Sequence, residues 1–263
     1  MSTRASSTTG GPKPRRTLAQ RAKATLARVK FASGDRAGGL ELSPRMTRAQ
    51  QRALMFWIRR LPPSLAARLP RLKLAVADRL GARQAHVFIN VAPQEGDLRL
   101  GNHIHAVSYI PQRYVVLQRD LFCRRVELGR ILYHELCHFL WPRLGNPQRR
   151  NYEAALRAEF RHGTRGELGY SSQWRKDELR VNGNSSHRKA GRRALWRDYL
   201  CESFCDTGSF MLLGPERRAK HSEYTLSRAA RQRRYRWIEL VLGVQASPNG
   251  KRNGTEMFPP AAA

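Results

Sequence analysis

The chain has 263 residues, and its 49 Lys and Arg against 20 Asp and Glu give a formal net charge of +29. A chain of this length buries a substantial core without disulfide or metal staples. Its apolar runs, such as residues 210–213, are far shorter than the roughly 20 residues that cross a bilayer, so we expect no integral membrane protein.

The first 39 residues predict a flexible, disordered basic arm. They contain no acidic residue before Asp35 and are rich in Ser, Thr, Gly, Pro and Arg, a composition that cannot support a core. An organelle transit peptide is the alternative interpretation of this arm. Residues 40–243 form the predicted folded domain, and residues 244–263 form a second flexible tail.

Within the domain, hydrophobic periodicity predicts an α+β fold. Apolar positions at helical spacing indicate two helices, over residues 46–60 and 64–80. Three short runs rich in β-branched and aromatic residues then predict a small sheet, at residues 86–91, 104–110 and 113–117. Helical spacing returns in four further segments, at residues 123–141, 152–160, 196–213 and 223–242. The rest of 143–194 is polar and is expected to be irregular.

The cysteines at positions 123, 137, 201 and 205 are too few and too unevenly spaced for a disulfide framework. We expect reduced, buried side chains that behave as small hydrophobes. This usage favours a reducing compartment, and hence a cytoplasmic protein. Cys201 and Cys205 would share one helix face, but no second pair completes a zinc cluster.

Positive charge occurs along the whole chain, with clusters at 149–150, 188–193 and 231–236. Such a balance predicts attraction to polyanions. The cluster at 231–236 comes closest to a phosphate-binding helix face. Two interpretations stay open for these clusters, solvent-exposed helix surface and functional contact with a polyanion.

His134, Glu135 and His138 form an HExxH pattern inside the apolar helix predicted at 123–141. Residues four apart lie on one helical face, so the two imidazoles can bind one Zn²⁺. Glu135 lies beside the metal, where it can take a proton from bound water. The pattern therefore predicts a catalytic zinc site, against the alternative of two structural histidines.

A hydrolytic zinc site needs a third protein ligand and an open position. Trp141 and Leu144 stand where a metzincin would have Gly and His, so that family is excluded. Glu202 and Asp206 lie one turn apart in the apolar helix predicted at 196–213, where two acids are costly to bury without a cation. We therefore predict Glu202 as the third ligand and Asp206 as the acceptor of a hydrogen bond from His134, in the second shell of the metal. Two solvent-facing acids are the alternative.

These two motifs together resemble the gluzincin branch of zinc metallopeptidases, of the thermolysin and neprilysin kind. The resemblance implies a zincin-like fold, in which a small sheet packs on the HExxH helix and on a second, ligand-bearing helix. It also implies a sheet edge that lines the cleft, for which 104–110 and 113–117 are the candidates. The chain departs from the pattern in two places. The spacing from His138 to Glu202, 202 − 138 = 64 positions, is longer, and Cys201 replaces an Asn that often precedes the ligand Glu.

The resemblance implies that peptide bonds are hydrolysed by zinc-activated water with Glu135 as the general base. A donor that stabilises the oxyanion is less definite. Tyr170 lies in a turn-rich stretch, and His221 and Tyr224 follow the ligand helix, so these three are the catalytic candidates. For each of them an ordinary surface or core role is the alternative.

The predicted function is therefore a soluble, cytoplasmic zinc metallopeptidase with a protein or peptide substrate. The alternative from another class is a basic nucleic-acid-associated protein whose zinc is structural or absent. Glu135 separates the two, because a structural site has no use for a carboxylate beside an open metal position. A peptidase that its basic arms bring weakly to nucleic acid, and a zinc hydrolase of another amide, also stay open.

Overall fold

The computed structural model describes residues 40–83, 86–89, 104–181, 189–214 and 221–243. Within these ranges the chain has a mixed α+β fold, as the periodicity predicted. The basic arm predicted at 1–39 and the tail predicted at 244–263 lie outside the described residues. Among the helices of the described part, none is long and apolar enough to cross a membrane.

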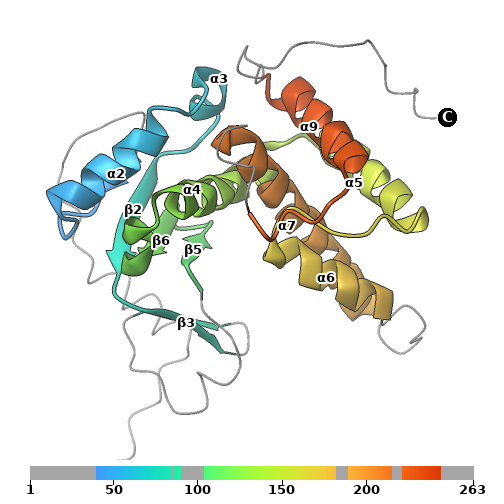
Figure 1. Ribbon diagram of the computed structural model, residues 1–263, viewed down its shortest axis with the longest axis horizontal. Coiled ribbons are helices and arrows are strands. Elements are labelled where there is room, and N and C mark those ends of the chain that lie inside the picture. Colours follow the sequence, from blue (N-terminus) through green and yellow to red (C-terminus); the bar gives the residue numbers. More distant parts are fainter. Residues whose placement is uncertain (1–39, 84–85, 90–103, 182–188, 215–220, 244–263) are drawn as a thin grey trace, which may run out of the picture.

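Strands and helices follow in a mixed order along the chain (Figure 1). The strands are β1 (Leu40–Leu42), β2 (Leu72–Ala77), β3 (Leu80–Arg83), β4 (His86–Ile89), β5 (Ala106–Tyr109) and β6 (Tyr114–Gln118). The helices are α2 (Arg48–Ile58), α3 (Pro63–Ala66), α4 (Arg125–Leu140), α5 (Asn146–Arg161), α6 (Tyr170–Val181), α7 (Lys189–Leu213) and α9 (Arg228–Leu242). Two 3-10 helices flank α4, η2 (Arg119–Cys123) and η3 (Trp141–Arg143).

The main sheet has four strands in the order β1-β2-β6-β5. β1, β2 and β6 run parallel, and β5 pairs antiparallel with β6. β3 and β4 form a separate antiparallel pair. β6 is buried along its whole length between β2 and β5, so the prediction of 113–117 as a candidate edge strand is wrong. β5 is the last strand in this order, which agrees with the prediction of an edge strand at 104–110.

The helix predicted at 64–80 is wrong, because α3 stops at Ala66 and residues 72–77 form β2. The apolar spacing of this segment suits a helix and a strand equally well. Pro70 ends the helical stretch. Beyond it Leu72 and Leu74 are fully buried in a strand that pairs on both sides, with β1 and with β6.

The segment 143–194 is more helical than its polar composition predicts. α5 is longer than the predicted helix at 152–160, α6 covers residues expected to be irregular, and α7 begins seven residues before 196. α6 has few apolar residues, and its buried face consists of Ser172, Lys176 and Leu179. Such a face carries no hydrophobic periodicity, so only its tertiary contacts make it helical.

α4 lies between the four-stranded sheet and the group of helices α5, α6, α7 and α9 (Figure 1). On one side it contacts α2, where the Tyr133 hydroxyl donates to the Trp57 carbonyl oxygen and the Trp57 indole donates to the Arg125 carbonyl oxygen. It also contacts β5 and packs along α7 on its other side. α5, α6 and α9 then gather around α7 (Figure 1). The HExxH helix is therefore buried between α2 and the sheet on one side and the helices around α7 on the other.

A buried ion network joins helices α5, α6, α7 and α9. Arg234 on α9, only 2% exposed, binds Glu159 on α5 at 2.6 Å and Glu167 before α6 at 2.5 Å. Lys176 on α6 binds Glu167 at 2.8 Å, and the Tyr199 hydroxyl on α7 donates to the same carboxylate. Because it is buried, Arg234 fits neither interpretation left open for the cluster at 231–236, solvent-exposed helix surface or contact with a polyanion. Burial alone would raise the pKa of Glu167, but Arg234 and Lys176 lower it to about 2.

We expect Arg234→Met to lower the free energy of unfolding by about 3–5 kcal/mol, because it leaves Glu159 and Glu167 buried without their main counter-ion. The matched control is Arg233→Met, since Arg233 is 50% exposed and reaches Glu159 only at 3.8 Å. It should cost less than about 1 kcal/mol. Urea unfolding of both variants checks this, and equal losses would contradict a structural role for the network.

The lowered pKa of Glu167 also predicts how stability depends on pH. Its folded-state pKa of about 2 lies below the usual value of 4.5, so the carboxylate stabilises the fold above about pH 4.5. That contribution is lost as the pH falls from about 4.5 towards 2. The urea midpoint of the wild type should therefore fall more steeply on acidification than that of Glu167→Gln. Parallel curves for the two proteins would contradict this assignment.

Candidate metal centre

The packing of α4 against α7 brings both predicted histidine ligands to the predicted glutamate. The Nε2 atoms of His134 and His138 lie 3.2 Å apart. Glu202 Oε2 lies 3.2 Å from His134 Nε2 and 3.8 Å from His138 Nε2. The three ligand atoms thus converge on one point between the helices.

These separations suit a zinc ion. Tetrahedral zinc with nitrogen or oxygen ligands at 2.0–2.1 Å places neighbouring ligand atoms about 3.4 Å apart. Glu135 and Asp206 are buried beside the three ligands, so the site gathers several carboxylates with little access to water. A divalent cation would offset this negative charge. The residues present therefore fit the metal that the HExxH pattern predicts.

The close contacts among the predicted ligands shift their pKa values. Burial alone would raise the pKa of Glu202, but His134, His138 and Arg175 lower it to about 2. Burial disfavours the imidazolium of His134, yet Asp206 and Glu202 raise its pKa well above the usual value. Burial alone would also lower the pKa of His138, but the hydrogen bond with Cys201 and, after it, Glu202 raise it.

Asp206 fixes the orientation of His134. Its Oδ1 lies 2.8 Å from His134 Nδ1, and its Oδ2 accepts hydrogen bonds from the Ser172 hydroxyl at 2.6 Å and the Ser172 amide at 3.2 Å. Gly169 makes this approach of α6 feasible, because a Cβ at that position would collide with the Asp206 carboxylate. With Nδ1–H donating to Asp206, His134 presents the lone pair of Nε2 to the centre.

Arg175 holds the other oxygen of Glu202. Its guanidinium lies 3.3 Å from Glu202 Oε1 and also donates to the Ser171 carbonyl oxygen at 2.7 Å. Ser172 and Arg175 are neighbours on one face of α6, so this helix supports the carboxylates of both Glu202 and Asp206. Neither residue could be found from the sequence, because a serine and an arginine three apart in a polar segment carry no distinguishing signal.

Glu135 contacts the edge of the sheet. The Ser108 hydroxyl on β5 lies 2.5 Å from Glu135 Oε2 and 3.2 Å from the Glu135 carbonyl oxygen. The carboxylate next to ligand His134 is thereby tied to the edge strand. Ser108 is a second contact that the sequence did not reveal.

The cysteines only partly follow the prediction of four buried side chains. All four are free; Cys137 and Cys205 are buried, Cys201 is partly exposed and Cys123 is exposed. For Cys123 the prediction is wrong, because η2 places it at the surface. Cys201 contacts the metal centre directly, with its Sγ 3.5 Å from His138 Nδ1.

The three predicted oxyanion donors differ in their surroundings. Tyr170 is 70% exposed at the start of α6. His221 binds Glu127 through Nε2 at 3.0 Å and accepts from the Glu223 amide through Nδ1, so both its ring nitrogens are engaged. The Tyr224 hydroxyl is buried without a hydrogen-bond partner among the described residues, and burial raises its pKa to about 12. Between His221 and Tyr224, only the Tyr224 hydroxyl is therefore not committed to another described residue.

Comparison with known proteins does not assign the site to a family. No family model, curated protein or solved structure matches this chain. The chemistry of the centre is therefore inferred from its own residues.

We expect Asp206→Asn to weaken zinc binding about 10- to 100-fold, because it weakens the hydrogen bond that orients His134. Asp198→Asn is the matched control, since Asp198 is an exposed aspartate two turns earlier on α7. Titration with a chelating zinc indicator measures both affinities. Equal affinity of Asp206→Asn and the wild type would show that Asp206 does not support a metal ligand.

Proposed function

We propose that this chain is a zinc-dependent peptidase of gluzincin type, with His134, His138 and Glu202 as metal ligands and Glu135 as the general base. The observation that carries the proposal is the convergence of three ligand atoms beside a buried carboxylate at a sheet edge. A structural metal site has no role for that carboxylate, whereas hydrolysis requires one.

The zinc ion would supply a bound water of pKa about 7 and would polarise the carbonyl of the substrate. Glu135 Oε2 would accept the proton of the attacking water and pass it to the leaving amine. The hydrogen bond from Ser108 keeps Oε2 in place for this transfer. Arg175 and Asp206 hold Glu202 and His134 in the orientation of ligands.

The substrate that suits this arrangement is an extended peptide. β5 ends the strand order of the sheet and carries Ser108, so a peptide that pairs with β5 would pass close to Glu135. Main-chain pairing of this kind binds peptides with little dependence on their sequence. A substrate bound at the sheet edge, beside the HExxH helix, is what makes the proposed site zincin-like.

The free cysteines support a reducing, cytoplasmic setting.

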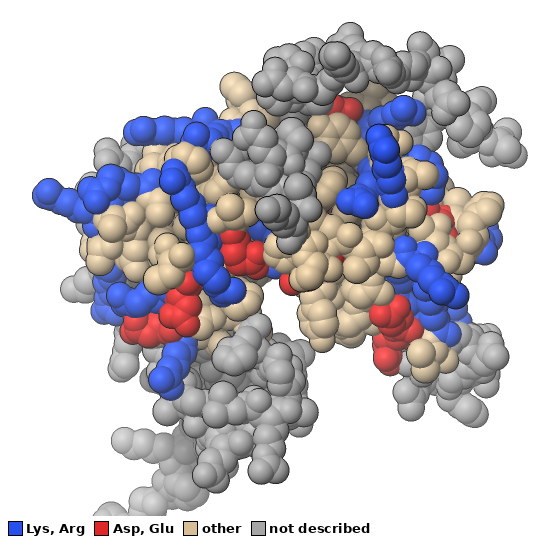
Figure 2. All heavy atoms as spheres, in the orientation of Figure 1, with Lys and Arg blue, Asp and Glu red and all other residues tan. Residues whose placement is uncertain are grey.

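Weak contact with polyanions is supported by the surface, where Lys and Arg lie at many places on the face shown in Figure 2. Part of this positive charge lies at a cavity of about 550 Å³. Four arginines line it, Arg157, Arg161, Arg192 and Arg193, together with Phe160, Leu179 and Trp196.

The test combines zinc analysis with cleavage of an unstructured protein such as casein. Wild-type protein should bind one zinc ion per chain and cleave casein. Glu135→Gln should keep the zinc and lose activity about 10²- to 10⁴-fold, the range for loss of a general base. His138→Ala and Glu202→Ala should lose both zinc and activity. His162→Ala, which changes an exposed histidine at the end of α5, is the control and should lose neither.

Three outcomes would refute the proposal. Wild-type protein without zinc would remove the metal centre and favour the nucleic-acid-associated alternative, which salt-sensitive binding would then support. Full zinc occupancy in Glu202→Ala would remove the third ligand. Unchanged cleavage by Glu135→Gln would remove the general base.

A further inference from the structure

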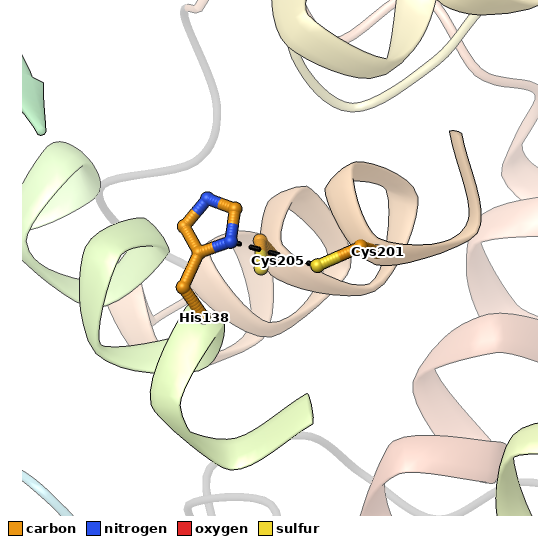
Figure 3. Close-up of side chains that lie close together, drawn as sticks. All are labelled: His138, Cys201 and Cys205. Atoms are coloured by element: carbon orange, nitrogen blue, oxygen red, sulfur yellow. Dashed lines mark hydrogen bonds between the residues drawn. The ribbon is translucent and has the colours of Figure 1, made fainter. Parts of the chain in front are cut away.

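Another group of potential ligands lies at Nδ1 of His138 and consists of His138 itself and two cysteines, Cys201 and Cys205 (Figure 3). Cys201 and Cys205 lie one turn apart on α7, and His138 reaches them from α4. Their ligand atoms, one imidazole nitrogen and two Sγ, all lie within 4.8 Å of one another. His138 thus faces Glu202 with Nε2 and Cys201 with Nδ1.

The spacing and the donor atoms suit a metal ion. Metal–sulfur bonds of about 2.3 Å and metal–nitrogen bonds of about 2.0–2.1 Å place the two ligand atoms about 3.6 Å apart in a tetrahedral site. His138 Nδ1 and Cys201 Sγ are 3.5 Å apart. Two sulfurs and one imidazole form a soft ligand set, which favours thiophilic ions over hard ones. Cys205 is buried, while His138 and Cys201 are partly exposed and give an ion a route to the site.

We propose that His138, Cys201 and Cys205 form a second metal site for a soft, thiophilic ion such as Cu(I), and that this site competes with the zinc site for His138. Binding releases the thiol protons to solvent. The thiolate site stands on its own residues, whereas the competition rests on the proposed zinc function.

The competition follows from the chemistry of imidazole. A neutral imidazole has one lone pair and one N–H. When Nε2 binds zinc, Nδ1 carries the proton and donates to Cys201. When Nδ1 binds the soft ion, Nε2 carries the proton and faces Glu202, so His138 is lost to the zinc site. One residue therefore serves one ion at a time.

Titration of metal-free, full-length protein with Cd²⁺ tests the thiolate site, with ultraviolet thiolate-to-cadmium charge transfer as the signal. The wild type should show the signal with saturation at one ion. Cys201→Ser and the double variant Cys201→Ser/Cys205→Ser should lose it, while Glu202→Gln should keep it. Cys123→Ser, which changes an exposed cysteine on η2, is the control and should keep it.

Cys201→Ser alone guards against misfolding, because Cys201 is partly exposed and circular dichroism can check its fold. No charge-transfer signal in the wild type would overturn the thiolate site. So would an undiminished signal in Cys201→Ser.

Equimolar Zn²⁺ and Cd²⁺, followed by desalting and elemental analysis, tests the competition. The wild type should retain about one ion per chain, mainly cadmium, and lose casein cleavage. In Cys201→Ser, equimolar Cd²⁺ should not displace zinc, and casein cleavage should equal that of the same variant loaded with Zn²⁺ alone. Two ions per wild-type chain would overturn the competition. A wild type that never binds zinc but gives the cadmium–thiolate signal would refute the proposed function and support the second site.

Discussion

The antiparallel packing of α4 on α7 is the constraint on which the centre depends. The contacts that hold the three ligands cross this helix pair or reach it from α6, and β5 adds the contact of Ser108 with Glu135; the ion pair between His134 and Asp206 lies at the middle of the pair. Gly208 permits the approach, because a Cβ there would lie 2.5 Å from the Cys137 sulfur. Glycine in a helix interior costs roughly 1 kcal/mol relative to alanine. The chain thus accepts a weaker helix where the two helices must lie close together.

The buried ion network explains how α7 is held for this purpose. Arg234 donates to the Ser203 hydroxyl at 2.8 Å, and Ser203 directly follows the ligand Glu202. The same arginine binds carboxylates from α5 and from the segment before α6. α6 in turn binds Glu202 and Asp206 through Arg175 and Ser172. α7 is therefore held by charged and polar contacts from α5, α6 and α9 in addition to its packing on α4.

The sequence predicted the parts of the site that depend on local spacing. HExxH and the pair Glu202 and Asp206 each lie within one helical turn, so periodicity alone places them on faces. It failed where long-range contacts decide the structure. Residues 72–77 are a strand because β1 and β6 flank them, and α6 is a helix because Glu167 and Asp206 engage its polar face. The supporting residues Ser108, Ser172 and Arg175 become visible only when three separate segments meet.

The distribution of charge has a consequence for encounters with other molecules. Several of the few carboxylates are used inside the protein, at Glu159, Glu167, Glu202 and Asp206, while Lys and Arg cover much of the face in Figure 2. An excess of positive charge attracts anions over about 8–10 Å at physiological salt, but it does not orient them. Under the proposed function, orientation would come from short-range features, the strand edge at β5 and the carboxylates of the centre beside it. Long-range capture and final alignment are thereby assigned to different parts of the molecule.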